Sequence, residues 1–244
     1  MYLEERQREI LSFLQEKKRC SVHELASALF VSEATIRRDL HQLAADGKVQ
    51  KTFGGAILCE NFASEIPFSV RSFDNLESKQ NICRQASSLI QEGMTLFLDG
   101  STTPEHLVPY LLHFRELQII TNNPRIPLLL ANTPLKIYCT GGMFNPTSQL
   151  YAGSIAERTI ANMNADLLFF SARGVDENGK ITDSSHSEHS LKQLMIANAK
   201  TTCFLCGHQK FNTSHLFTVA HCRDMDYVFS DVPLSDSLLG KKQK

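Results

Sequence analysis

Residues 21–43 read SVHELASALFVSEATIRRDLHQL, a pattern of two short helices joined by a tight turn. Ser21 is followed three residues later by Glu24, the capping box that opens a helix. Ser32 caps a second helix, whose apolar residues Ile36, Leu40 and Leu43 recur at helical spacing. Two helices joined by so short a turn, the second rich in exposed polar side chains, predict a helix-turn-helix.

The flanking residues extend this pattern into a complete small domain. An earlier helix places Leu3, Ile10, Leu11, Phe13 and Leu14 on one face. The helix that follows Ser32 is expected to end at Asp46-Gly47, where glycine supplies a left-handed cap. Two β-prone runs around Gly54-Gly55 predict a hairpin over 48–58, the wing. Residues 1–58 are therefore predicted to form a winged helix-turn-helix.

The second helix of the pair presents polar side chains suited to the major groove of double-stranded DNA. Arginine can hold guanine with two hydrogen bonds, threonine can touch a thymine methyl or a phosphate, and amides at a helix start favour phosphate. Lysines on the wing are placed for the flanking DNA backbone. The expected DNA-binding residues are Ser32, Thr35, Arg37, Arg38, Lys48 and Lys51.

Charge alone does not decide this function. The 244-residue chain has a formal net charge of -1, and residues 1–58 hold nine Lys/Arg against eight Asp/Glu. The arginines could form a solvated helix face, or the first 58 residues could serve protein–protein contact. The exposed Thr35, Arg37 and Arg38 favour DNA.

The bulk composition predicts an ordinary soluble protein. Hydrophobic residues make up 42% and charged residues 21%, and no apolar run approaches the roughly 18–20 residues that span a bilayer. The start, MYLEERQREI, lacks the features of a signal peptide. Seven cysteines do not form a disulfide framework, so we expect a cytoplasmic protein without membrane contact.

Residues 59–75 lack clear periodicity and contain Pro67, which predicts a linker. A helix is expected over about 76–92, ended by Gly93. Apolar runs that alternate with helical segments then predict strands at 95–99, 117–121, 136–140, 166–172, 201–206 and 227–231. This rhythm indicates an α/β domain over 76–235 with a mainly parallel, buried sheet.

Small polar residues follow three of these strands. They are Asp99, Gly100, Ser101, Thr102 and Thr103 after the first, Thr121, Asn122 and Asn123 after the second, and Thr140, Gly141 and Gly142 after the third. Ligands of open α/β sheets bind at the carboxyl ends of strands. A phosphate at the Ser/Thr-rich turn, with Asn122 and Asn123 binding sugar hydroxyls, is the simplest interpretation. Each loop taken singly could be only a turn and a helix cap.

Other chemistry-bearing residues give weaker patterns. Cys203 and Cys206 lie three apart in a strand, so they point to opposite faces and are expected to be buried free thiols rather than metal ligands. His186 and His189 are interpreted as incidental histidines of a loop. We expect no metal and no cofactor. Asp99, Asp183, Glu188 and Lys210 could form an acid/base set, which keeps open the alternative of a sugar-phosphate isomerase with a DNA-binding appendage.

The N-terminal pattern resembles that of the DeoR family of bacterial transcription regulators. Ten positions match with the right gaps: Arg6, Ile10, Leu14, Ser32, Thr35, Ile36, Arg37, Arg38, Asp39 and Leu40. The resemblance implies that Asp39 orients neighbouring arginines or caps local structure rather than touching bases.

The resemblance continues to about residue 231. It covers residues 99–103, Thr121-Asn122, Gly141-Gly142, Gly153, Arg173-Gly174-Val175, Glu188, Lys192, Met195 and Lys210-Phe211. It implies a sensor domain similar in fold to ribose-5-phosphate isomerase, which binds a phosphorylated sugar or sugar acid that usually weakens operator binding. Arg173 and Lys210 thereby join the effector-binding candidates.

Two positions depart from the family pattern. Ser101 stands where the family commonly has glycine, and Gly207 stands where it commonly has aspartate. The second change removes a carboxylate expected near the ligand, so the effector is expected to differ from the usual ones. The sequence patterns and the resemblance together predict a non-enzymatic, DNA-binding repressor of carbohydrate-metabolism genes. We expect a homo-oligomer, a dimer or tetramer, because symmetric operators require at least two DNA-binding domains.

Overall fold

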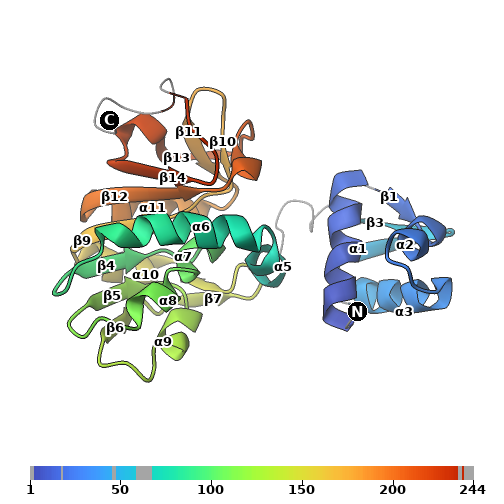
Figure 1. The fold of residues 1–244 in the computed structure, drawn as a ribbon, viewed down its shortest axis with the longest axis horizontal. Helices are drawn as coiled ribbons and strands as arrows, with labels where there is room; N and C mark the ends of the chain where they lie inside the picture. Colours follow the sequence, from blue (N-terminus) through green and yellow to red (C-terminus); the bar gives the residue numbers. More distant parts are fainter. Residues whose placement is uncertain (1–2, 18, 46–47, 59–67, 236–237, 239–244) are drawn as a thin grey trace. The chain divides into compact units, whose positions relative to one another are not determined.

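The computed structural model describes residues 3–17, 19–45, 48–58, 68–235 and 238. The chain divides into two compact units, Met1–Val70 and Arg71–Lys244 (Figure 1). Each unit has its own hydrophobic core.

The smaller unit is a three-helix bundle with a small antiparallel sheet. Its helices are α1 (Leu3–Lys17), α2 (Val22–Ala28) and α3 (Glu33–Ala45). Its strands β1 (Arg19–Ser21), β2 (Val49–Thr52) and β3 (Gly55–Leu58) form a sheet in the order β1-β3-β2. The winged helix-turn-helix is therefore confirmed, and the cap expected at Gly47 lies outside the described residues. Strand β1 was not expected from the sequence; it has three residues and is stabilised by pairing with β3.

Local hydrogen bonds fix the start of both helices of the pair. The capping box forms as expected: the Glu24 amide donates to Ser21 Oγ at 3.1 Å, and the Ser21 amide donates to Glu24 Oε2 at 2.7 Å. Ser32 Oγ accepts from the Thr35 amide at 3.2 Å. These bonds satisfy amides that a helix start otherwise leaves unpaired.

The larger unit is built on a six-stranded parallel sheet in the order β14-β12-β9-β4-β5-β6. Along the chain these strands are β4 (Thr95–Leu98), β5 (Gln118–Thr121), β6 (Lys136–Cys139), β9 (Ala165–Phe170), β12 (Ala199–Cys206) and β14 (Tyr227–Ser230). All six correspond to predicted strands, so the expected parallel sheet is confirmed.

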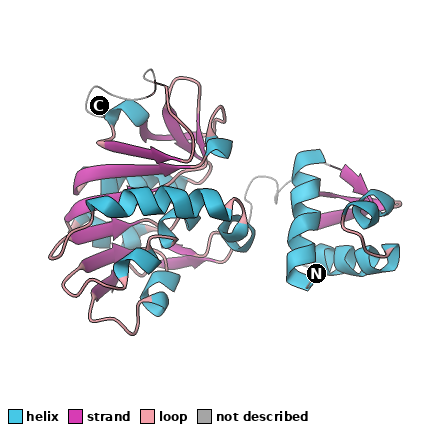
Figure 2. Cartoon of the chain, in the orientation of Figure 1, coloured by secondary structure: helices cyan, strands magenta, loops and turns pink. Residues whose placement is uncertain are grey.

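Helices cover both faces of this sheet (Figure 2). One core joins it to α6 (Leu76–Ala86), α8 (Val108–Leu111) and α9 (Arg125–Leu129). The other core joins it to α10 (Ser154–Ala161) and α11 (His186–Ala197). Cys203 lies in the first core and Cys206 in the second, both as free thiols, which confirms that they face opposite sides.

Several local predictions differ from the structure. The helix expected to run to residue 92 ends at Ala86 and tightens into the 3-10 turn η1 (Ser87–Leu89). There the Ser87 hydroxyl donates to the Arg84 carbonyl at 2.9 Å, and the Ser88 hydroxyl donates to the Gln85 carbonyl at 2.7 Å. Such side-chain bonds to the preceding turn compete with the helical pattern. His186 and His189 begin helix α11 rather than lying in a loop, because Ser185 caps that helix.

Part of the interval expected as a linker is helical. Helix α5 (Phe68–Phe73) lies within 59–75, and residues 59–67 are outside the described part. Phe68 is fully buried, so an apolar anchor stabilises this short helix. The structure also contains a hairpin of β7 (Met143–Asn145) and β8 (Leu150–Ala152), which was not predicted from the sequence. The same holds for a sheet of β10 (Gly174–Val175), β11 (Lys180–Asp183) and β13 (Phe217–His221).

Candidate functional site

Strand order reverses between β4 and β9, which places their carboxyl ends on either side of a crevice. Asp99 follows β4 and Ser171 follows β9. Asp99 is buried and accepts hydrogen bonds from Ser101 Oγ at 2.7 Å and from the Ser171 amide at 3.3 Å. Burial raises the pKa of Asp99 above its ordinary value, against the opposing charge of Lys192.

Lys192 lies at the centre of three buried carboxylates. Its Nζ is 2.5 Å from Asp183 Oδ2, 3.5 Å from Glu188 Oε2 and 3.6 Å from Asp99 Oδ2. Burial lowers the pKa of Lys192, but these three charges outweigh burial and raise it overall. Burial likewise raises the pKa of Asp183, and the charge of Lys192 outweighs that effect and lowers it. These carboxylates are therefore neutralised only in part by one lysine.

Two of the predicted effector residues add positive charge beside this group. Arg173 Nε lies 3.8 Å from Asp183 Oδ1, and its buried Nη2 has no hydrogen-bond partner among the described residues. Lys210 Nζ donates to Ser171 Oγ at 2.7 Å. Burial lowers the pKa of Lys210 to about 8, and nearby cations, including Lys192 and Arg173, add to the effect.

Two further cations were not predicted from the sequence. Arg71 comes from α5, and burial lowers its pKa to about 10, with the charge of Arg173 adding to the shift. Lys79 is 4% exposed and donates to the carbonyl oxygens of Arg71 and Asp74. Burial lowers the pKa of Lys79 to about 8, and the charge of Lys210 contributes. The available signal was the position of Lys79 on the buried stripe of α6, where a lysine needs polar partners.

These residues form one group, which we name the charge cluster. It contains the cations Arg71, Lys79, Arg173, Lys192 and Lys210 and the carboxylates Asp99, Asp183 and Glu188. Among these eight side chains the cations outnumber the carboxylates by two, and the exposed Asp74 also acts on Lys79.

A small cavity of about 10 Å³ opens inside the charge cluster. Its lining includes Asp99, Asn122, Glu188 and Lys192. Asn122 Oδ1 and Glu188 Oε1 are buried there without a hydrogen-bond partner among the described residues. This space holds about one water molecule, so a larger ligand must displace side chains to enter.

The other predicted effector residues shape the loops around this cavity. The Thr121 hydroxyl accepts from the Asn123 amide at 3.0 Å, and Asn123 Nδ2 donates to Glu105 Oε2 at 3.0 Å. A Cβ on Gly100 would come within 2.9 Å of Leu150, so the close packing there requires glycine. The side chains of Thr102 and Thr103 are buried in α7 (Thr102–Glu105), and Gly141 and Gly142 take positive φ in a turn after β6. Their contact with a ligand stays a prediction.

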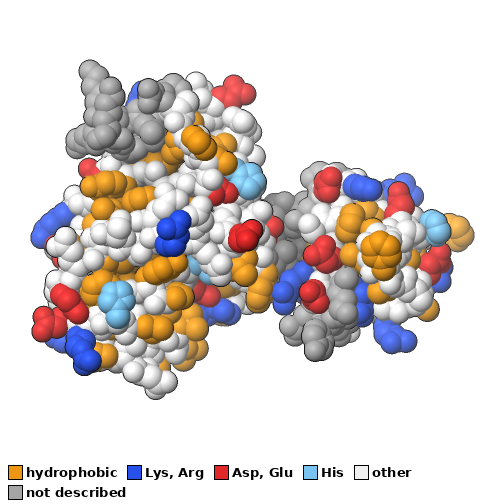
Figure 3. Space-filling model, viewed as in Figure 1, with side chains coloured by type: hydrophobic (Ala, Val, Ile, Leu, Met, Phe, Trp, Pro, Cys, Tyr) orange, Lys and Arg blue, Asp and Glu red, His pale blue; other side chains and the backbone are white. Residues whose placement is uncertain are grey.

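The residues predicted to bind DNA lie at the start of α3 and on the wing. Arg37 and Arg38 are exposed, and Arg37 Nη2 donates to Glu33 Oε2 at 2.6 Å. Lys51 is exposed on β2, and Lys48 precedes that strand. Acidic and basic side chains are interspersed on the face in Figure 3, in keeping with the near-neutral net charge. Base and phosphate contacts stay predictions.

Asp39 has a structural role on the opposite side of α3. It is 1% exposed, and both its oxygens accept from Arg6 of α1, at 2.5 Å from Nε and 3.2 Å from Nη2. This paired bond holds α1 against α3.

Two family models match the chain. The DeoR-like helix-turn-helix domain matches residues 6–62, and the DeoR C terminal sensor domain matches residues 74–232. The chain is 30% identical to the HTH-type transcriptional regulator GolR of Listeria innocua over 244 residues, which are 100% of this chain and 96% of that protein. It is 28% identical to the glycerol-3-phosphate regulon repressor of Escherichia coli, over 92% of this chain and 89% of that one.

The L-fucose operon activator of Haemophilus influenzae is 30% identical over 94% of this chain and 92% of its own. Among solved structures, ribose 5-phosphate isomerase A of Methanocaldococcus jannaschii matches with a TM-score of 0.42 and 15% identity, over 57% of this chain and 55% of that one. Within the described residues, none of the helices has the length and apolar character needed to span a membrane.

Proposed function

The chain belongs to the DeoR family of DNA-binding transcription regulators, and from this premise we propose that it is a repressor whose operator affinity is set by a phosphorylated sugar bound in the charge cluster. The relatives include regulators named for glycerol 3-phosphate and for fucose, which supports a carbohydrate-linked role.

One observation carries the choice of ligand: the charge cluster holds two more cations than carboxylates. A phosphate monoester carries a charge of about −1.5 to −2 at neutral pH, which matches that excess. It would also supply acceptor oxygens to Arg173 Nη2, which is buried without a partner among the described residues. The unpartnered Asn122 Oδ1 and Glu188 Oε1 can accept from sugar hydroxyls.

On the DNA side, we propose that Thr35, Arg37 and Arg38 reach base edges, while Ser32, Lys48 and Lys51 contact phosphates. The exposure of Arg37 and Arg38 at the first turns of α3 supports this assignment. Binding to a symmetric operator requires two heads, so we propose a dimer or tetramer, which light scattering of the purified protein tests.

The test is a gel shift of the purified protein on DNA upstream of its own operon, with a panel of sugar phosphates and their unphosphorylated parents. We expect a specific shift that one phosphorylated sugar reduces and its parent sugar does not. A shift unaffected by every phosphate would contradict the effector assignment. No shift at low salt, where phosphate contacts are strongest, would contradict either the operator or the DNA-binding assignment.

The isomerase alternative has less support in the geometry. Asp99 and Asp183 are held by hydrogen bonds and by Lys192, which leaves Glu188 Oε1 as the cluster's one carboxylate oxygen known to lack a partner among the described residues. Turnover of pentose or hexose phosphates at high protein concentration would favour the isomerase, and its absence would remove that alternative.

A further inference from the structure

Helix α5 is the first described element of the chain after the wing strand β3, with residues 59–67 between them. We propose that Arg71 and Lys79 couple ligand charge to α5: an anion in the charge cluster fixes α5 in place, and an empty cluster leaves it weakly held. This inference rests on the proposed function, because it takes the ligand to carry a phosphate.

Helix α5 is capped at its C-terminal end by a lysine of the next helix. Its last carbonyl groups have no partner within the helix, as at every helix C-terminus. The ammonium group of Lys79, from the next helix, fills that place by donating to the Arg71 carbonyl and to the Asp74 carbonyl at 2.5 Å. Lys79 therefore acts as the C-terminal cap of α5, and α5 is held while this lysine is charged.

The second step is the electrostatic position of Lys79. It is 4% exposed, and the charges of Lys210 and Arg71 both disfavour its ammonium form. Asp74, which is exposed, opposes them. In the absence of an anion the cap is thus a buried cation beside other cations. A phosphate among those cations would remove the repulsion and strengthen the cap.

The third step joins α5 to the loop that was predicted to bind phosphate. His106, directly after α7, hydrogen-bonds the backbone of Ser72 in α5. Burial lowers the pKa of His106, and the charge of Lys79 adds to the shift, so this imidazole is held towards its neutral form. Cys83 of α6 donates to the Thr103 carbonyl at 3.1 Å. Helix α6 therefore contacts the Ser101–Thr103 turn directly, and α5 contacts the residue that follows α7, the helix which begins in that turn.

Arg71 supplies the direct link. Its backbone carbonyl accepts from Lys79, while its side chain lies in the field of Asp99, Asp183, Glu188 and Arg173. One residue thus belongs both to the end of α5 and to the charge cluster. A ligand that binds the ordered form of α5 better than the loosened form shifts the balance between the two.

Hydrogen exchange of the full chain, with inorganic phosphate as the probe, tests this inference. In the wild type we expect exchange over residues 68–79 to slow by about 5- to 150-fold when phosphate is added, the usual range of coupling between sites. In Lys79→Met, which keeps the length of the side chain and removes its charge, this slowing should be lost even at phosphate concentrations that calorimetry shows to saturate the variant. Arg84→Gln, which changes an exposed cation of the same helix, should respond like the wild type.

The outcomes separate the two proposals. If calorimetry shows no phosphate binding to the wild type, the proposed function fails and this inference fails with it. If phosphate binds but exchange over 68–79 is unchanged, only the coupling through α5 is overturned. A purely structural role for Lys79 predicts instead that Lys79→Met speeds exchange equally with and without phosphate, so that the response to phosphate persists.

Discussion

Replacing Lys210 by methionine should make the empty protein more stable and a poorer receptor for phosphate. The fall of the Lys210 pKa from 10.5 to about 8 corresponds to roughly 3 kcal/mol of cost to the folded state at neutral pH. Methionine removes that cost and also the charge-assisted hydrogen bond to Ser171, which contributes about 1.5–3 kcal/mol. The net gain of about 0–1.5 kcal/mol should raise the midpoint of thermal unfolding of the larger unit by up to about 6 °C.

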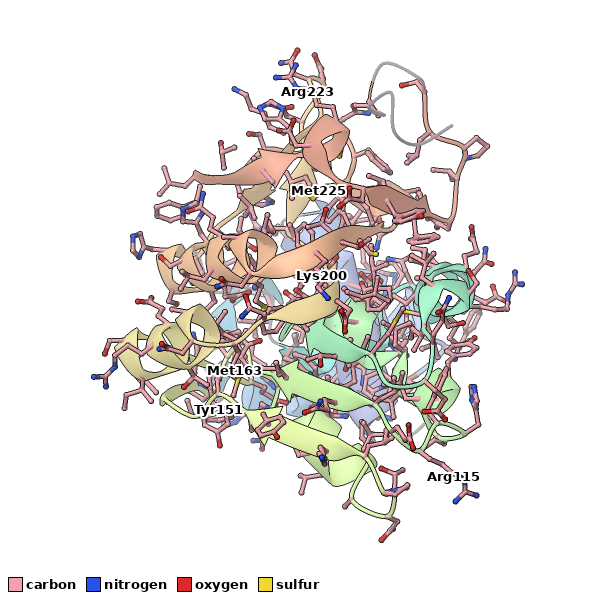
Figure 4. All side chains as sticks on the ribbon, turned by 90° about the vertical axis from the view of Figure 1, so that its left-hand side faces the viewer. Arg115, Tyr151, Met163, Lys200, Arg223 and Met225 are labelled. Carbon is pink, nitrogen blue, oxygen red and sulfur yellow. The ribbon has the colours of Figure 1, made fainter. Side chains whose placement is uncertain are left out.

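The same substitution should weaken binding of a phosphorylated sugar by about 10- to 100-fold, because a charge-assisted hydrogen bond contributes about 1.5–3 kcal/mol. Scanning calorimetry of the full chain and isothermal titration measure the two effects. The matched control is Lys200→Met. Lys200 (labelled in Figure 4) is 78% exposed and pairs with Asp166 at 2.7 Å, and such surface pairs contribute about 0–1 kcal/mol. A Lys210→Met protein that is less stable and binds the sugar phosphate normally would refute the reasoning.

Three more predictions concern DNA, stability and pH. Arg37→Ala should weaken operator binding by about 1–3 kcal/mol, and an unchanged gel shift would remove Arg37 from the interface. Lys51→Ala should reduce the slope of log K for DNA binding against log salt concentration by about 0.9, and an unchanged slope would remove Lys51 from the interface. Arg6→Ala should destabilise the smaller unit by about 1.5–3 kcal/mol in denaturant melts, because it leaves Asp39 buried without its partner; an unaltered midpoint would show that the pair contributes little. Affinity for the sugar phosphate should fall as the pH rises through about 8, by up to about tenfold per unit, as Lys210 loses its proton. The empty protein should become more stable from about pH 8 to 10.5, because in that range the unfolded chain binds more protons than the folded chain. Constant affinity for the sugar phosphate from about pH 7 to 9.5 would contradict the predicted loss of affinity.

Predictions from local patterns succeeded where neighbouring residues determine the structure. The capping box of Ser21 and Glu24 depends on residues three apart, and the structure has both of its bonds. The six apolar runs became the six parallel strands for the same reason, since each buried strand carries its own apolar signal. The opposite orientation of Cys203 and Cys206 followed from strand geometry alone.

Features that depend on long-range partners were missed. The order of the sheet, which makes Asp99 and Ser171 neighbours, joins residues 72 apart in sequence. Arg71 lies in a segment without periodicity, and its helix is stabilised by tertiary contacts rather than by its own six residues. The position of Lys79 on the apolar stripe of α6 indicates a buried lysine, but its carbonyl partners cannot be identified from the sequence. The charge cluster therefore could not be assembled from the sequence, although Asp99, Arg173 and Lys210 were already candidates.

The measurement that tests the account most directly is the affinity for a phosphorylated sugar with the protein free and with it bound to operator DNA. Linkage requires that the sugar phosphate and the operator weaken each other's binding by the same factor. The account predicts that operator-bound protein binds the sugar phosphate about 5- to 150-fold more weakly, and that the same factor appears when operator affinity is titrated with and without the ligand. Equal affinity in the two states would contradict effector control of DNA binding.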